Sequence, residues 1–271
     1  MKSWFFWISM SCLACAPAPP KEDPKTVVVQ TLRLERERME GISIGFDLDG
    51  KTSTDLDDTT CRKPDFVDPD GKPGIDNQLA RLLPLIDVAG QGAIDALLQG
   101  AINEGKVILV MELDPGTGSW KVLRGKDTPL LGADGRVLAG QTLALDSNAD
   151  LGSTTSVHMR DDTHVDIDPM ALDLPVIVFG ELYELKLADA RSRLTWNEDG
   201  SLDGVLGGSV PVEQILTMVR TAQGMSGVDY LGLFGGSIRE TADLGPDGTG
   251  DCDAISMAAT FHAVPAFTFE P

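Results

Sequence analysis

The stretch that decides the fold is ADARSRLTWNEDGSLDGV, residues 188–205. Two apolar runs, 188–196 and 201–205, lie on either side of Asn197-Glu-Asp-Gly200. Because Asn, Asp and Gly tolerate the backbone angles of a tight turn, this arrangement predicts a β-hairpin. Asp134-Gly135 separates two more apolar runs in the same way. The middle of the chain is therefore predicted to be mainly antiparallel strand and turn.

Alternation of apolar and polar residues supports this prediction. Val157, Met159, Val165 and Ile167 alternate with polar residues. Successive side chains of a strand point to opposite faces, so this segment predicts a pair of strands with one face in water. Further strands are expected at 26–33, 106–113 and 254–269.

Helices are expected in two places. Apolar residues recur with helical spacing over 75–102, and Asp76 stands where a helix cap belongs. Pro84 and two later glycines interrupt the pattern, which predicts a kinked helix or a helix pair near the N-terminus. A short helix is expected near 212–221, directly after Pro211. The prediction is an α+β fold, mainly an antiparallel β-sheet or sandwich with helices at one side.

The composition is that of an acidic globular protein. The chain has 271 residues, of which 42% are hydrophobic, and 42 Asp and Glu oppose 22 Lys and Arg for a net charge of −20. This charge repels the phosphates of nucleic acids and anionic lipid surfaces, so no nucleic-acid partner is expected. Cations are the natural partners of such a chain.

The N-terminus has the layout of an export signal. Lys2 precedes the apolar run Trp4–Met10, and small residues follow it. The run is far shorter than the roughly 20 residues that a bilayer-spanning helix needs. We therefore expect residues 1–14 to be a signal peptide that is removed. Residues 15–25 are rich in proline and charge, which predicts a tether, with a single β-rich domain over 26–271.

Leu13-Ala14-Cys15 resembles a bacterial lipobox, in which the cysteine is lipidated and becomes the first mature residue. This sequence has Cys12 where the lipobox has an aliphatic residue, and a plainly secreted protein is the alternative. The resemblance implies that a lipid on Cys15 holds the protein to a membrane. Among such lipoproteins an acidic residue after the cysteine favours the inner membrane; Ala16 stands here, which favours the outer membrane.

Two cysteines remain once Cys12 and Cys15 are assigned to the export signal. Cys61 and Cys252 are predicted to form a disulfide, because an exported protein matures in an oxidising compartment. The bridge would close a loop of roughly 190 residues and constrain the unfolded chain. The alternatives are two buried thiols or a metal site, but no histidine or further cysteine lies at ligand spacing from either residue.

Three Asp-rich loops carry the strongest functional signal. Calcium takes six to eight oxygen ligands, and Asp-x-Asp-Gly loops supply several at once. The third loop, at 247–253, resembles one step of a thrombospondin type 3 calcium repeat. None of the loops fits an EF-hand. The candidate ligands are Asp47, Asp49, Asp57, Asp68, Asp70, Asp76, Asp247, Asp251 and Asp253.

The predicted disulfide would bring these loops together, since Cys61 lies between the first two and Cys252 lies in the third. Carboxylates gathered in this way repel one another unless a cation joins them. A structural Ca²⁺ is therefore predicted. The alternative is that Asp-Gly pairs are ordinary turn residues with their carboxylates in water.

No common catalytic signature is found: the chain has no G-x-S-x-G elbow, H-E-x-x-H pair, Walker loop or G-x-G-x-x-G loop. The histidines, His158, His164 and His262, are expected on the surface. A carboxylate pair of a secreted hydrolase has no fixed spacing in sequence, so that alternative stays open. A further alternative is a carrier of a hydrophobic ligand, with residues 174–179 and Leu206-Gly-Gly lining a cavity between sheet and helices.

In style the whole chain resembles uncharacterised surface lipoproteins of Gram-negative bacteria, which combine an export cysteine, Asp-Gly loops and a β-rich body. The resemblance implies an exported outer-membrane lipoprotein and transfers no activity. The resulting hypothesis is a calcium-stabilised binding or structural module, which is favoured over an enzyme while the hydrolase alternative stays open.

Overall fold

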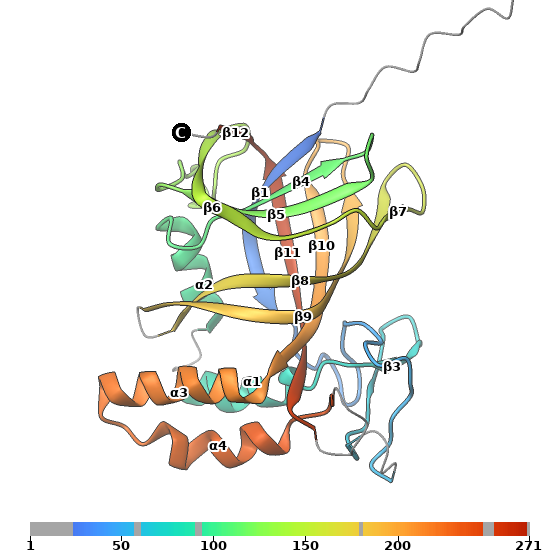
Figure 1. The fold of residues 1–271 in the computed structure, drawn as a ribbon, viewed down its shortest axis with the longest axis vertical. Coiled ribbons are helices and arrows are strands. Elements are labelled where there is room, and N and C mark those ends of the chain that lie inside the picture. The colour runs from blue at the N-terminus through green and yellow to red at the C-terminus, as the bar shows by residue number, and fades with distance from the viewer. Residues whose placement is uncertain (1–23, 57–60, 90–93, 179–180, 246–251, 270–271) are drawn as a thin grey trace, which may run out of the picture.

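The computed structural model describes residues 24–56, 61–89, 94–178, 181–245 and 252–269. A ten-stranded sheet forms the body, in the order β12-β6-β5-β4-β1-β11-β10-β9-β8-β7 (Figure 1). Its strands are β1 (Lys25–Leu34), β4 (Leu109–Asp114), β5 (Ser119–Lys126), β6 (Thr142–Thr154), β7 (Val157–Met159), β8 (His164–Val178), β9 (Glu181–Trp196), β10 (Leu202–Pro211), β11 (Ala254–Pro265) and β12 (Phe267–Phe269).

The sheet is mixed, because β12 pairs with β6 in parallel while every other pairing within it is antiparallel. The predicted hairpin at Asn197–Gly200 is confirmed: Leu202 pairs with Trp196, and Gly200 adopts a φ of 81°. Strands β7 to β10 follow one another in the chain and pair in that order, and β11, which comes some forty residues after β10, pairs with β10 to continue the same sheet. A continuous sheet therefore takes the place of the two separate sheets of a sandwich.

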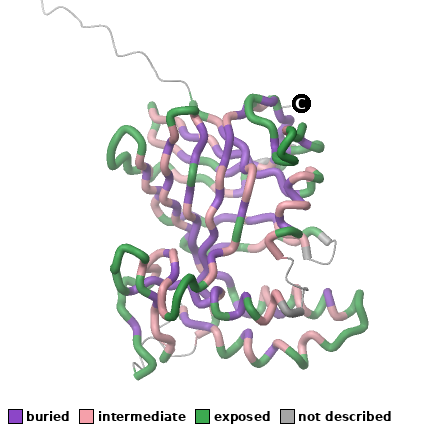
Figure 2. Tube along the Cα trace, turned by 180° about the vertical axis from the view of Figure 1, so that it is seen from behind, coloured by how far each residue is buried: buried purple, intermediate pink, exposed green. Residues whose placement is uncertain are grey.

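The sheet curls so that β6 lies beside β8, although the two strands are not hydrogen-bonded neighbours (Figure 1). Gly152 on β6 makes the close approach possible, since a Cβ there would lie 2.5 Å from the carbonyl oxygen of Ala171. The apolar side chains fill the space that the curled sheet encloses, and the strands are buried along much of their length (Figure 2). Val28, Trp120 and Leu194 are among the residues with 1% exposure or less.

Four helices are described: α1 (Leu79–Ala89), α2 (Ile94–Asn103), α3 (Val212–Ser226) and α4 (Tyr230–Glu240). The first two fall within the segment where a kinked helix or a helix pair was expected, and α3 runs five residues beyond the expected 221. Helix α4 was not expected, because its sequence is rich in glycine. None of the helices in the described ranges has the length and apolar character that a membrane crossing requires.

Helices α3 and α4 form a hairpin at one end of the sheet (Figure 1). Leu216 of α3 and Ile238 of α4 are buried in one cluster with Leu82 of α1 and Ile255 of β11. The amide of Gly232 donates to the carboxylate of Asp229 at the start of α4. This second, smaller core stabilises the end of the molecule at which the Asp-rich loops lie.

The loop lobe, defined here as residues 35–56 and 61–78, lies beside these helices and contains the short strands β2 (Phe66–Val67) and β3 (Pro73–Ile75). Arg81 of α1 stacks over the ring of the fully buried Phe66 at 4.7 Å. The predicted disulfide Cys61–Cys252 is present, with Cα atoms 6.0 Å apart. It ties the loop lobe to the segment that enters β11.

Candidate metal centre and adjoining cleft

Three of the predicted ligands meet in the loop lobe. Asp47, Asp49 and Asp76 each offer one carboxylate oxygen, and the three oxygens lie within 4.8 Å of one another. Asp76 follows β3, and its amide donates to the carbonyl of Phe46 at 2.8 Å. Its Oδ2 accepts from the amide of Leu48 at 2.6 Å, rather than from the amides of α1 that it was expected to cap. The chain from 46 to 50 is thereby wrapped around Asp76.

Turn chemistry orients the other two carboxylates. The amide of Gly50 donates to Asp47 Oδ1 at 2.7 Å, and the amide of Lys51 donates to Asp49 Oδ1 at 2.9 Å. Gly50 has a φ of 76°, which a residue with a Cβ rarely adopts. Gly74 on β3 also has a positive φ, and a Cβ there would lie 2.8 Å from the carbonyl oxygen of Lys51. Two glycines therefore allow the loop and β3 to come close enough to gather the carboxylates.

Burial makes the charged forms of Asp76 and of two carboxyl groups that interact with it, Asp65 and Asp243, unfavourable. Asp76 is 2% exposed, and burial raises its pKa to about 8, with the neighbouring charges of Asp65, Asp243 and Asp49 adding to the effect. Asp243 is 6% exposed, and burial raises its pKa to about 7. Burial also raises the pKa of Asp65, although the amide of Ser53, donating at 2.6 Å, opposes the shift. A cation among these groups would stabilise their charged forms.

A buried polar network holds the cluster against the sheet. The amide of Gln78 donates to Ser256 Oγ at 2.8 Å, and both the hydroxyl and the amide of Ser256 donate to the carboxylate of Asp243. The side-chain nitrogen of Asn77 donates to Ser43 Oγ at 2.9 Å, while its oxygen accepts from the amide of Ala258 at 3.0 Å. Ser256 and Ala258 belong to β11, so the loop lobe is anchored to the sheet by hydrogen bonds.

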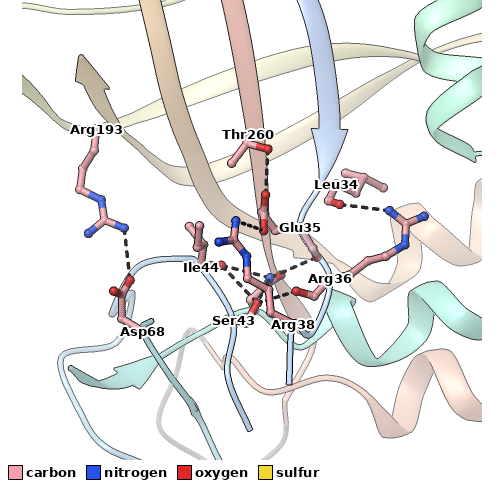
Figure 3. A network of polar contacts seen from close by, with 10 residues as sticks. Leu34, Glu35, Arg36, Arg38, Ser43, Ile44, Asp68, Arg193 and Thr260 are labelled. Atoms are coloured by element: carbon pink, nitrogen blue, oxygen red, sulfur yellow. Dashed lines mark hydrogen bonds and ion pairs between the residues drawn. The ribbon is translucent and has the colours of Figure 1, made fainter. Parts of the chain in front are cut away.

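The same network extends to the start of the lobe, as Figure 3 shows. Glu35 Oε1 accepts from Thr260 Oγ1 of β11 at 2.8 Å, and Glu35 Oε2 pairs with Arg38 at 3.2 Å. The side-chain nitrogen of Asn77 donates to the carbonyls of Glu35 and Ile44. Bonds to both ends of the segment 35–44 thus fix the path of the chain into the first Asp-rich loop.

A hollow of about 580 Å³ opens between this loop and the outer surface of β8 and β9. Arg191 donates to the carbonyl of Asp47 at 2.8 Å, and Arg193 donates to the carbonyl of Gly45 at 2.9 Å. The guanidinium of Arg193 also lies over the ring of Phe46 at 4.9 Å. Both signs of charge line the hollow, through Asp47, Asp49, Lys72, Asp168, Arg191 and Arg193.

The remaining predicted ligands are placed differently. Asp68 and Asp70 form their own turn, in which the amide of Asp70 donates to Asp68 Oδ1, and Asp68 faces Arg193 at 3.8 Å (Figure 3). Asp253 is exposed. None of these three belongs to the cluster of Asp47, Asp49 and Asp76, which is the one group of this kind among the described residues. Asp57, Asp247, Asp251 and the lipidation candidate Cys15 lie outside the described residues.

Asp65, Asp243 and Ser256 were not predicted to have a role in the centre. Asp65 and Asp243 stood next to predicted loops, and their sequence context resembles that of other acidic turn residues. Ser256 lies within an apolar strand, where a single serine gives no signal of a buried hydrogen bond to a carboxylate. Only the tertiary structure shows these partners.

The histidines are each paired with a different aspartate. His158 Nε2 lies 2.8 Å from Asp168, His164 Nδ1 lies 2.8 Å from Asp161, and His262 Nδ1 lies 2.7 Å from Asp203. A turn does bring β7 and β8 together, with His158 opposite Asp166. The two histidines nevertheless use separate partners, so the described structure holds no shared histidine site.

Comparison with known proteins provides no relative. No protein-family model matches the chain, and neither a curated protein nor a solved structure matches it. The functional argument therefore rests on the residues of this chain.

Proposed function

We propose that the protein is an exported, membrane-tethered lipoprotein whose loop lobe is stabilised by Ca²⁺ and acts as a binding or structural module. The observation that carries the calcium proposal is the convergence of Asp47, Asp49 and Asp76, with oxygens within 4.8 Å of one another. Two ligands at a typical Ca–O distance of about 2.4 Å can lie at most about 4.8 Å apart, so each pair of these oxygens is within the separation that one shared ion allows.

The donor set favours calcium over zinc or copper. All three donors are carboxylate oxygens, and no histidine or cysteine belongs to the group. Hard oxygen donors suit Ca²⁺, whereas zinc and copper sites in proteins prefer imidazole or thiolate. Asp49 is exposed, so water can complete the six to eight ligands that Ca²⁺ takes. The raised pKa of Asp76 supports the same proposal, because a buried carboxyl group gains most from a neighbouring cation.

The hydrolase alternative receives less support. A catalytic carboxyl group needs access to substrate. Asp76 is 2% exposed and is held by the amide of Leu48, and Asp243 is 6% exposed and is held by Ser256. Neither residue lines the hollow beside β8 and β9. The burial of these two strongly perturbed carboxyl groups supports a structural role for them.

The carrier alternative is also less supported. Val176 and Ile177 pack against the main core, and none of residues 174–177 lines the hollow. The hollow has charged walls on both sides. As a binding module the protein would present a polar cleft, in which calcium fixes the wall made by residues 45–50 and the arginines of β9 hold it in place.

Isothermal titration calorimetry with Ca²⁺ at pH 8 tests the metal proposal. The wild type is expected to bind, and Asp49→Asn to bind about tenfold more weakly or not at all, since one charged ligand is lost. The amide oxygen of asparagine can still accept from Lys51, so the turn is retained. Asp70→Asn is the matched control, because Asp70 is exposed, lies in the same lobe and is outside the cluster. Absence of binding by the wild type, or equal weakening in both variants, contradicts the proposal.

Mass spectrometry tests the membrane proposal separately. The protein purified from membranes is expected to begin at Cys15 and to carry the added mass of a lipid, and Cys15→Ser is expected to remove that mass. An unmodified Cys15 in membrane-associated protein contradicts the lipid anchor and leaves the calcium test unaffected.

A further inference from the structure

We propose that the end of the molecule where β1 begins rests on a phospholipid bilayer through an apolar surface. We name this surface the terminal patch; it consists of Leu130, Leu131, Leu138, Phe267 and Phe269. The inference rests on the proposed N-terminal anchor, and it adds the orientation of the body and the residues that contact the membrane.

The side chains of the terminal patch are large, apolar and exposed. Their exposed fractions run from 43% at Leu131 to 65% at Leu130. Phe267 and Phe269 stand two residues apart on β12, the edge strand of the sheet, so both side chains point to the same face. Single exposed apolar residues are ordinary, whereas exposed apolar residues gathered at one end of a molecule favour a contact surface.

One buried side chain joins the members of the patch. The carbonyl of Gln141 accepts from the amide of Phe267 at 2.9 Å. Its side-chain nitrogen donates to the carbonyls of Leu130 at 3.2 Å and Leu138 at 2.7 Å. Its side-chain oxygen accepts from the amide of Leu130 at 2.9 Å. Because these bonds all come from one residue, they hold the loop 127–141 beside β12.

The position of the patch relative to the chain identifies its partner. The amide of Ala266, directly before β12, donates to the carbonyl of Thr26 near the start of β1 at 3.1 Å. β12 and the start of β1 lie at the same end of the molecule, and the α3–α4 hairpin lies at the opposite end (Figures 1 and 2). Residues 16–24 can span at most about 35 Å. A lipid on Cys15 therefore keeps the terminal patch near the bilayer.

The mixture of positive and negative side chains around the terminal patch favours contact with a bilayer of zwitterionic lipid. Lys126 pairs with Ala144, which in turn pairs with Phe269, so a cation flanks the patch across the sheet. Arg136 lies in the adjoining loop, where Asp134 accepts from its amide. Cations and anions are interleaved here, so the apolar side chains supply the attraction. The contact is then expected to depend little on salt.

The test uses a fluorescent probe at two matched positions. Leu130 in the patch is 65% exposed, and Leu233 in α4, at the opposite end, is 64% exposed. Leu130→Cys and Leu233→Cys are each labelled with an environment-sensitive dye, with the disulfide left oxidised. The lipidated protein is reconstituted in phosphatidylcholine vesicles that contain a spin-labelled phosphatidylcholine as quencher. The probe at 130 is expected to be quenched several-fold more strongly than the probe at 233.

A second arm separates this inference from the anchor. The protein for this arm begins at residue 15, carries Cys15→Ser and has an N-terminal histidine tag. A nickel-chelating lipid holds the tag on the vesicles. The same end of the chain is therefore attached to the membrane whether or not cells lipidate Cys15. Equal quenching at 130 and 233 in vesicle-bound protein overturns the docking proposal even if the lipid anchor is correct. Shielding of the probe at 130 without vesicles, growing with protein concentration, assigns the patch to a second copy of the chain and also overturns it.

Discussion

The curled sheet and the loop lobe are held together by different forces. In the sheet most of the fully buried residues are apolar, among them Val28, Leu194 and Ala259. In the loop lobe and its junction with α1, Asp76 and Asn77 are as deeply buried, at 2% and 0% exposure. Hydrophobic burial responds little to pH or to metal ions, whereas buried carboxylates respond to both. The sheet should therefore be indifferent to conditions that strengthen or weaken the lobe.

The largest effect is expected from pH when calcium is removed by a chelator. Asp76 has a pKa raised from 3.8 to about 8 in the folded protein, so the folded state holds its proton more tightly than the unfolded state. Its contribution to stability is complete below about pH 4 and is lost as the pH rises to about 8. At about 1.4 kcal/mol per pKa unit, the upper bound is on the order of 6 kcal/mol.

Denaturant unfolding between pH 4 and pH 8 measures this loss. Saturating Ca²⁺ should suppress it, because the cation stabilises the charged carboxylates. Asp76→Asn should reduce the slope in chelator and leave a smaller one from Asp243, whose pKa is about 7. A slope that is the same in wild type and Asp76→Asn would show that another group controls the pH dependence.

A cavity in the sheet should destabilise the protein nearly as much, but without any dependence on calcium. Leu194 is 0% exposed in the main core, and Leu194→Ala is expected to lower the free energy of unfolding by about 2–5 kcal/mol. The decrease should be equal in calcium and in chelator, as measured by urea unfolding. A calcium-dependent decrease would show that the sheet and the lobe are not independent.

Removal of the disulfide should weaken the lobe specifically. Cys61 and Cys252 stand 191 residues apart, and their bridge restricts the unfolded chain. The double variant Cys61→Ala, Cys252→Ala is expected to lose about 2–4 kcal/mol. It should also bind Ca²⁺ more weakly, since Asp65 and Asp243 are placed by the segments that the bridge joins. A calcium affinity that is unchanged in calorimetry would show that the disulfide does not contribute to the geometry of the metal centre.

The amide network should give a smaller effect. Asn77→Ala removes a side chain that bonds to Ser43, Ile44 and Ala258, leaving buried polar groups without a partner at a cost of about 1–3 kcal/mol. Asn103→Ala is the control, because the amide of Asn103 donates to Gly135 in an exposed bond. Its cost should be about 0.5 kcal/mol or less in thermal unfolding. An equal loss of stability in the two variants would show that the buried amide of Asn77 contributes no more than an exposed one.

Local sequence patterns were sufficient for part of the architecture. The hairpin at Asn197–Gly200 follows from turn chemistry between apolar runs, and the bridge between Cys61 and Cys252 follows from counting cysteines in a chain that is predicted to be exported. Asp47, Asp49 and Asp76 were among nine candidate ligands, because each lies in or next to an Asp-Gly loop. These features depend on neighbours in the sequence or on very few possible partners.

Features that depend on distant partners were not predicted. Helix α4 contains three glycines within YLGLFGGSIRE, and its low helix propensity is outweighed by burial of Ile238 against α1 and α3. Strand β11 ends at Pro265, and this proline favours a strand end without indicating that β12 then pairs in parallel with β6. The selection of Asp76 over Asp68 for the carboxylate cluster depends on the bridge between Phe46 and Asp76, and Asp68 faces Arg193 instead.

Hydrogen–deuterium exchange with calcium and with chelator at pH 8 tests the central claim most directly, because it reports on the lobe and the sheet in one experiment. The account predicts that Ca²⁺ slows exchange at the amides of residues 46–53 and 73–78, while β9, β10 and β11 exchange at the same rates in both conditions. No change in the lobe, or equal protection of lobe and sheet, would contradict the claim that a cation among Asp47, Asp49 and Asp76 stabilises the loop lobe.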